Sequence, residues 1–134
     1  VHEGGTGELL AYNCGVGARH ERIFYSDVVS ASAITQEGTP GEIVRMSDHL
    51  KDEHVPFIKM DIEGAEYDAI LGMEKTLENH PVLMVSIYHK VEDLFRLQLL
   101  IEKMCPNVYD YYIRHYSPTV IETVLYAVPK NMKK

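Results

Sequence analysis

Ionisable side chains follow three predicted strands, at the points where those strands end. They are Asp61, Glu63, His89, Lys90, Arg114 and His115. The segments between them alternate between strand and helix, a pattern that predicts crossover connections and a mostly parallel sheet. In open sheets of this kind, ligands bind beyond the carboxyl ends of the strands. The three groups of side chains are therefore expected to lie around one site.

The first two groups each have a chemical and a structural interpretation. Asp61, in the segment MDIEGAE, either faces a ligand or caps the following helix, whose positive end Glu63 and Glu66 would complement. Histidine titrates near neutral pH, which suits His89 to the role of a general base. The structural alternative for His89 is a hydrogen bond to a neighbouring loop. The residue types alone leave both alternatives open.

The third group, Arg114 and His115, is a candidate for substrate binding. An arginine can hold a carboxylate or phosphate with two hydrogen bonds, although a surface ion pair is the plainer interpretation of Arg114. The motifs HExxH, GxSxG and the EF-hand loop do not occur in the sequence, and no cluster of cysteine and histidine is visible. No metal site is therefore predicted, and Asp61 with Glu63 or His89 is the one combination that could hold a divalent ion.

Length and charge limit the classes of function. The 134 residues fit one domain, residues 1–134, with room for a buried core. Thirteen basic and twenty acidic residues give a net charge of −7, which argues against nucleic acid or an anionic membrane as partner. The longest apolar run, Pro81 to Tyr88, is far shorter than the roughly 20 residues of a membrane span. Two cysteines without a CxxC pair and no visible signal peptide lead us to expect reduced thiols and a cytoplasmic location.

The amino-terminal half is expected to contain short strands followed by a strand–helix alternation. Turn residues separate the brief strands predicted over 8–14, 22–25 and 42–46, with a loop or hairpin tip over 30–42. A short helix over 47–53, which Ser47 or Asp48 would cap, then precedes a strand over 55–61.

A longer helix is predicted over 64–79, and a strand follows it over 81–89. The apolar stripe of this helix comprises Ala65, Ala69, Ile70, Met73 and Leu77. Gly72 is expected to weaken the helix by about 1 kcal/mol relative to alanine.

The carboxy-terminal part predicts a helix over 92–104 and then strands over 108–116 and 122–129 that pair in antiparallel fashion. The fold class expected for the whole chain is α/β. More closely, we expect a Rossmann-like three-layer α/β/α sandwich whose mixed sheet ends in an antiparallel hairpin.

The segment Ile58–Glu66, IKMDIEGAE, with Ile70–Met73 after it, resembles the FkbM-type methyltransferases, which use S-adenosylmethionine. That family writes these segments approximately as IKIDVEGAE and LxGA. The segments NCGVGARHERIFYS, RMSDHL, PVLMVSIYHKVEDLF and RHYSPTVIETVLYAVP resemble other parts of the family, so the resemblance covers about residues 10–129. The family's glycine-rich loop and its ribose-binding acidic residue lie upstream of these segments. The expected domain is therefore an incomplete methyltransferase domain that lacks its first strands.

The resemblance implies an S-adenosylmethionine-dependent methyltransferase that O-methylates a sugar or another small metabolite. It implies that Asp61 lies near the reacting centre and that His89 is the base or the acceptor-binding group. Asp61 and Glu63 are then expected to bind the cofactor, and His115 and Arg114 to bind the acceptor.

Two other functions remain open, and one consequence concerns partners. The chain could be a truncated, non-catalytic α/β module that associates with another chain, or a hydrolase that uses a metal held by carboxylate and histidine. Missing strands would leave a sheet edge exposed, which predicts self-association as a strand-exchanged dimer or an aggregate.

Overall fold

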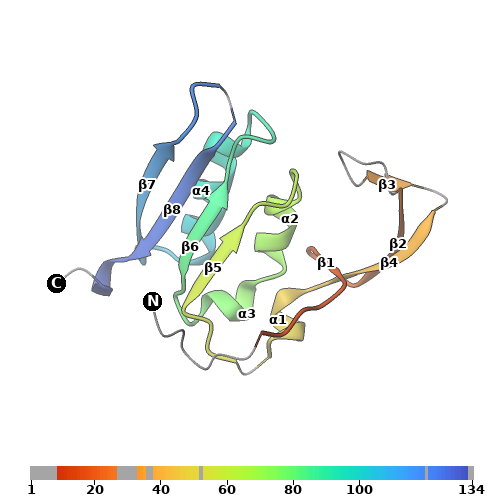
Figure 1. The fold of residues 1–134 in the computed structure, drawn as a ribbon. Helices are drawn as coiled ribbons and strands as arrows, with labels where there is room; N and C mark the ends of the chain where they lie inside the picture. Colours follow the sequence, from red (N-terminus) through yellow and green to blue (C-terminus); the bar gives the residue numbers. More distant parts are fainter. Residues whose placement is uncertain (1–8, 27–32, 36–37, 52, 120, 133–134) are drawn as a thin grey trace, which may run out of the picture.

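The structure, a computed structural model, contains two four-stranded sheets connected by a short helix (Figure 1). It describes residues 9–26, 33–35, 38–51, 53–119 and 121–132. This is a mixed α/β fold, as the sequence predicts, with two mixed sheets and four α-helices in the described residues.

The first sheet has the strand order β1-β4-β2-β3. Its strands are β1 (Gly15–Val16), β2 (Glu21–Ser26), β3 (Ala33–Thr35) and β4 (Thr39–Val44). The strand β1 runs parallel to β4, whereas β2 is antiparallel to both β3 and β4. Part of the loop predicted over 30–42 therefore belongs to β3 and β4, while residues 30–32 and 36–37 lie outside the described residues.

The second sheet has the strand order β5-β6-β8-β7. Its strands are β5 (Phe57–Met60), β6 (Val82–Ser86), β7 (Tyr109–His115) and β8 (Thr123–Pro129). The strands β5 and β6 are parallel, and β8 is antiparallel to both β6 and β7. The predicted carboxy-terminal hairpin is thus confirmed. The strands β5, β6 and β7 all run in one direction, so their carboxyl ends lie at one edge of the sheet.

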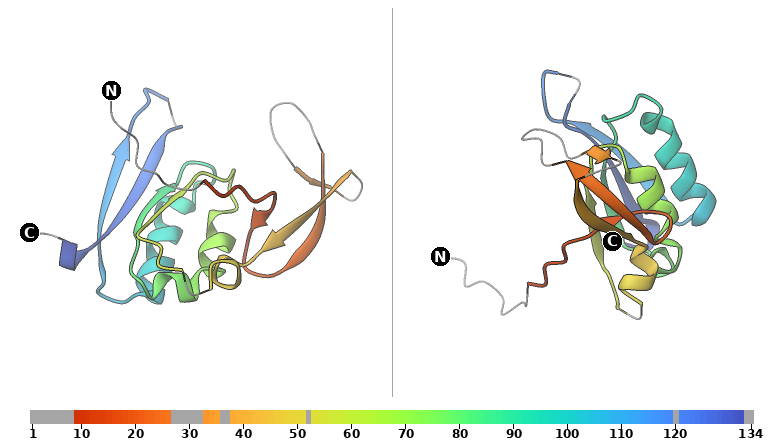
Figure 2. Two further views of the ribbon diagram at one scale, coloured as in Figure 1. Left: turned by 60° about the horizontal axis from the view of Figure 1, so that its bottom comes forward. Right: turned by 90° about the vertical axis from the view of Figure 1, so that its right-hand side faces the viewer.

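The helices of the described residues are α1 (Met46–His49), α2 (Glu66–Leu71), α3 (Glu74–Leu77), α4 (Asp93–Met104) and the short 3-10 helix η1 (Lys130–Met132). Of these, α2, α3 and α4 pack on one face of the second sheet (Figure 2). On the opposite face of β5, Phe57 and Lys59 are exposed. Of the predicted three-layer sandwich, the described residues thus show two layers, the sheet and one layer of helices.

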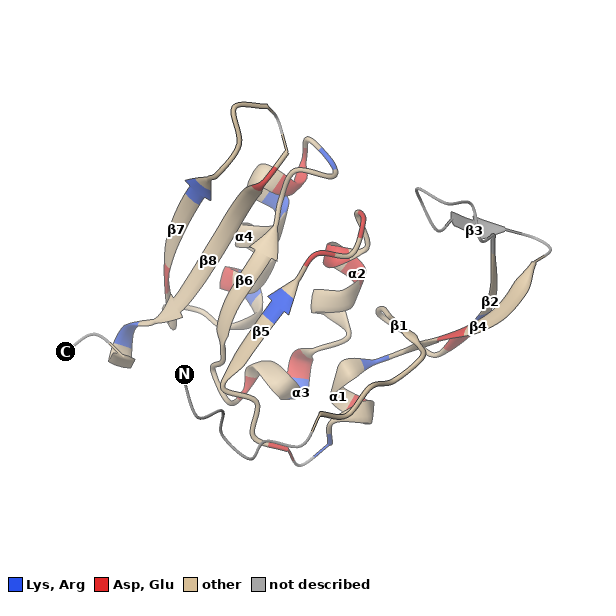
Figure 3. Ribbon diagram, in the orientation of Figure 1, with Lys and Arg blue, Asp and Glu red and all other residues tan. Residues whose placement is uncertain are grey.

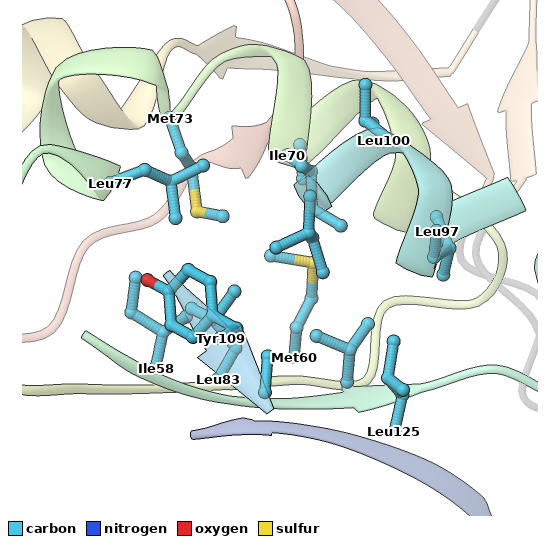
Figure 4. Packing of buried hydrophobic residues seen from close by; sticks show 14 of the residues in the cluster. Ile58, Met60, Ile70, Met73, Leu77, Leu83, Leu97, Leu100, Tyr109 and Leu125 are labelled. Atoms are coloured by element: carbon cyan, nitrogen blue, oxygen red, sulfur yellow. The ribbon is translucent and has the colours of Figure 1, made fainter. Parts of the chain in front are cut away.

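The core lies between α2, α3, α4 and this sheet (Figure 4). Its fully buried side chains include Ile70, Leu77, Leu83, Leu97 and Ile101. Burying a side chain of this size stabilises the fold by about 1.5–3 kcal/mol. The alternation in β5, where Ile58 and Met60 are buried, supplies the facing layer. Both cysteines are free, and Cys105 is buried in this core.

Ser47 interrupts the helix that the sequence predicts over 64–79. The carbonyl oxygen of Gly72 accepts the Ser47 N–H at 3.0 Å, and the Ser47 hydroxyl accepts the N–H groups of Lys75 at 3.0 Å and Thr76 at 3.4 Å. These bonds replace the helical bonds that would continue α2 into α3. One long helix is therefore wrong, and so is the role predicted for Ser47, which caps α3 and makes no capping bond to α1.

Two further expectations about local structure are wrong. Residues 9–14 form no strand, because no described strand lies beside them to accept their hydrogen bonds, and Leu9 is 92% exposed. Ala65 does not belong to the buried stripe, since it precedes the first turn of α2 and is exposed. The strands β2 and β4 to β8 and the helix α4 lie within a few residues of their predicted ranges, whereas the sequence predicts neither β1 nor β3 as a strand. No helix in the described part of the chain has the length and apolar character needed to cross a membrane.

Gly72 also allows a close approach between the two halves of the chain. A Cβ added there would overlap the carbonyl group of Gly17, which follows β1. We therefore expect Gly72→Ala to lower the free energy of unfolding by about 2 kcal/mol, the usual cost of overpacking, despite the better helix propensity of alanine. Gly15→Ala is the matched control, because its Cβ would meet Ile43 Cγ1 at an ordinary 3.5 Å. Urea denaturation of the three proteins measures the difference, and a Gly72→Ala variant as stable as wild type would contradict the prediction.

The turn after α4 gives a pH-dependent contribution to stability. Glu102 accepts the Asn107 N–H at 2.9 Å and the Tyr111 hydroxyl at 3.1 Å, and these bonds lower the pKa of Glu102 below its ordinary value of 4.5. The stabilisation is complete above 4.5 and is lost as the pH falls through the lower pKa of the folded state.

We therefore expect Glu102→Gln to lower the melting temperature at pH 7, and the difference from wild type to disappear at the acid end of the transition. Melting curves between pH 7 and pH 3 test this expectation. Glu78→Gln removes one exposed carboxylate and so controls for net charge. A gap between Glu102→Gln and wild type that stays constant with pH would show that the carboxylate does not act through its ionisation.

Candidate functional site

Asp61 and His89 meet at the carboxyl ends of β5 and β6. Asp61 directly follows β5, and His89 lies three residues beyond the end of β6. The parallel register pairs Met60 with Val85, so the two segments leave the sheet side by side. Asp61 Oδ1 then lies 3.4 Å from His89 Nε2. The structure thus brings together two of the residues that the sequence singles out.

A tight turn holds the Asp61 segment in this position. Glu63 and Gly64 have φ angles of 55° and 92°, a left-handed backbone that reverses the chain between β5 and α2. The Lys90 ammonium group donates a hydrogen bond to the Gly64 carbonyl oxygen at 2.5 Å. A Cβ on Gly64 would lie only 3.0 Å from Lys90 Cε, so glycine keeps this approach open. Lys90 therefore joins the turn to the segment that follows β6.

Glu66 lies behind His89 and is fully buried. Its Oε1 accepts the Ile62 N–H at 3.0 Å and lies 2.9 Å from His89 Nδ1. The second oxygen, Oε2, has no hydrogen-bond partner. The His89 side chain is 8% exposed, and its ring nitrogens do not point at the nearby oxygens well enough to form hydrogen bonds. Glu66 and His89 are thus close enough for an ion pair while both keep unused polar atoms.

Acidic residues are concentrated in the segment between β5 and α2 (Figure 3). Glu63 is 79% exposed, with Oε2 3.6 Å from His89 Nε2, and Asp61 is 38% exposed. The Tyr88 hydroxyl donates to Asp61 Oδ1 at 3.3 Å. Burial, followed by the Asp61 charge, raises the pKa of Tyr88, so this hydroxyl stays protonated as a donor. The site therefore presents negative charge and one phenolic donor to solvent.

A hollow of about 530 Å³ adjoins Tyr88, between the segment after β6 and the β7–β8 hairpin. His115 lies in its wall, and His115 Nδ1 is 2.8 Å from the Thr123 hydroxyl. The other lining residues are Ile87, Tyr88, Lys90, Val91, Leu94, Pro118, Thr119 and Thr123. This volume is in the range of small-molecule sites. His115 and Tyr88 therefore line one hollow, whereas Asp61 and His89 are not among its lining residues, because β8 lies between β6 and β7.

Arg114 is not part of this wall. Neighbouring residues of a strand point to opposite faces of the sheet, so Arg114 and His115 diverge. The Arg114 guanidinium group donates to the Ile113 carbonyl oxygen at 3.0 Å and is exposed. The structure therefore separates the two residues that the sequence offers together for substrate binding.

Glu66 belongs to the site, although the sequence analysis interpreted it only as a charge that complements the positive end of the helix. The signal was its spacing, because Glu66 precedes Ala69, Ile70 and Met73 by three, four and seven residues and so shares their buried helix face. A carboxylate on such a face is seldom buried without a partner. Asp61, Glu66 and His89 each place one possible ligand atom within 4.8 Å of the others, and they are the described residues that could hold a metal ion.

Comparison with known families identifies a relationship over most of the chain. The family model for the methyltransferase FkbM domain matches residues 9–112. This range contains Asp61, Glu66 and His89, whereas His115 lies beyond its end. A search of curated proteins finds no match.

A solved structure is also similar. It is the crystal structure of methyltransferase FkbM from Methylobacillus flagellatus KT, which matches with 31% sequence identity and a TM-score of 0.69. The match covers 87% of this chain and 27% of the solved chain. The present chain thus spans about a quarter of the length of that protein.

Proposed function

The chain belongs to the FkbM methyltransferase family, and on this premise we propose that it acts in methyl transfer from S-adenosylmethionine to a hydroxyl group of a sugar or another small metabolite. The observation that carries the proposal is the meeting of Asp61 and His89 at the carboxyl ends of two parallel strands, 3.4 Å apart. Ligands of open α/β sheets bind at this edge.

S-adenosylmethionine, when bound, supplies a methyl group on a positively charged sulfonium that is already a good leaving group. The exposed carboxylates of Glu63 and Asp61 suit a positively charged donor. Their turn lies at the end of β5 and is fixed by Lys90, so their positions are defined before the donor binds. These two residues are the part of the cofactor site that we assign to the described chain.

The acceptor is proposed to lie in the hollow beside Tyr88. Its wall offers the hydroxyl groups of Thr119 and Thr123 and the imidazole of His115, which are suited to a polyhydroxylated molecule. Val91 and Leu94 supply apolar surface for the carbon skeleton. Asp61 and His89 then hold the acceptor hydroxyl and assist the loss of its proton, because alignment and proton removal are the main tasks left to the protein.

His89→Ala is expected to lower methyl transfer at least 100-fold, the usual contribution of a group that assists proton transfer. The assay follows transfer of a labelled methyl group from S-adenosylmethionine to a panel of sugars and hydroxylated metabolites. His20→Ala is the matched control, because His20 also lies near a carboxylate, Asp48, at 3.2 Å but on the exposed surface. Turnover unchanged in His89→Ala, at unchanged melting temperature, would remove His89 from the reaction.

S-adenosylhomocysteine, the spent donor, is expected to bind the chain at one site with micromolar affinity in a calorimetric titration. Glu63→Gln should weaken this binding about tenfold, the effect of losing one charged hydrogen-bond acceptor. Glu53→Gln, at an exposed position before β5, should leave the affinity unchanged. A flat titration would instead favour the non-catalytic module that associates with another chain.

A further inference from the structure

The cluster behind Asp61 contains more hydrogen-bond acceptors than donors. Glu66 is fully buried, and only one of its oxygens is used, by the Ile62 N–H. His89 is nine-tenths buried and makes no hydrogen bond through either ring nitrogen. An ionised carboxylate only accepts hydrogen bonds, and a neutral imidazole donates one. Buried polar atoms without partners are unfavourable, and a positively charged partner would satisfy them.

Asp61, Glu66 and His89 converge on one place. One possible ligand atom from each of Asp61, Glu66 and His89 lies within 4.8 Å of the other two. Nitrogen and oxygen ligands bind first-row metal ions at about 2.0–2.2 Å, so ligands on opposite sides of one ion lie about 4.4 Å apart. The span of the cluster is therefore compatible with one bound ion. Asp61, 38% exposed at the mouth, has room to adjust its position.

The charges around the cluster also favour a cation. Glu63 lies at the rim, 3.6 Å from His89 Nε2. The Lys90 ammonium group is nearby, but it donates its hydrogen bond to the Gly64 carbonyl oxygen. Three carboxylates thus surround one imidazole. The Tyr88 hydroxyl supplies a single hydrogen bond of 3.3 Å to Asp61, which leaves the excess of negative charge in place.

We propose that Asp61, Glu66 and His89 bind one divalent transition-metal ion, of the Zn²⁺ or Mn²⁺ class. One nitrogen and two carboxylates suit these ions, whereas Ca²⁺ takes six to eight oxygen ligands. Glu66 holds the buried side of the ion, because its carboxylate is fixed by the Ile62 N–H. Asp61 closes the solvent side, and an open coordination position there would lie near Tyr88, whose hydroxyl donates to Asp61.

The site depends only on the side chains described above, whereas its role rests on the proposed function. An acceptor hydroxyl in the open position would lose its proton to solvent at a lower pH than in free solution, because a bound cation stabilises the resulting oxyanion. His89 then acts as a metal ligand and so as the acceptor-binding group, the second of the two roles considered for it.

Isothermal titration of the metal-free chain with ZnCl2 and MnCl2, in a non-chelating buffer, tests the site. We expect one ion per chain, and at least tenfold weaker binding in Asp61→Asn, Glu66→Gln and His89→Asn. The control is His20→Asn with Asp48→Asn, which removes a second histidine–carboxylate pair from the exposed surface and should leave the affinity unchanged. Affinity that falls in this control but not in the cluster variants would overturn the proposal, and so would the absence of binding.

Two further measurements keep the result independent of folding defects and of the methyl-transfer assay. Asp61→Asn changes a partly exposed side chain, so it is expected to fold even if the buried Glu66 variant does not. In the unaltered chain, Mn²⁺ should broaden the NMR signals of Tyr88 and His89 before those of His20, and the reverse order would overturn the site. Metal binding without methyl transfer would reject the proposed function alone, and methyl transfer without metal binding would reject this inference alone.

Discussion

The parallel pairing of β5 with β6 is the constraint on which the site depends. Parallel strands place their carboxyl ends at the same edge, and the register of Met60 with Val85 brings the following segments to the same height. Asp61 and His89, 28 positions apart in the chain, thereby become neighbours. A shift of one residue in that register would turn the strand's buried side chains to the opposite face. Core packing of Ile58 and Leu83 therefore also fixes the position of the polar groups beyond them.

Much of the second sheet could be predicted from the sequence, because its elements carry strong local patterns. The helix α4 has an uninterrupted apolar face, and β6 is almost entirely apolar, so type and position follow from periodicity. The same rules place Asp61, His89 and His115 at one sheet edge. The resemblance to the family rests on a sequence motif, IKMDIEGAE, which periodicity alone does not reveal.

What the sequence did not reveal depends on contacts between distant segments. The expected strand over residues 8–14 has strand-like residues, but a strand also needs a neighbour, and the described residues offer none. Arg114 and His115 are adjacent in the chain, and the alternation of β7 separates them. For Glu66, the helix-end interpretation was correct about position, since it is the first residue of α2. It missed that the same residue lies on the buried face.

The insertion of Ser47 between α2 and α3 has a consequence for how the chain acquires its structure. The amide groups that start α3 are satisfied by a hydroxyl from 28 residues earlier, so this helix turn is not autonomous. The carbonyl group at the end of α2 depends on the same residue. Both helix ends are therefore completed by Ser47 of α1, which ties the segment after the first sheet to the helices of the second, although the two sheets exchange no strand.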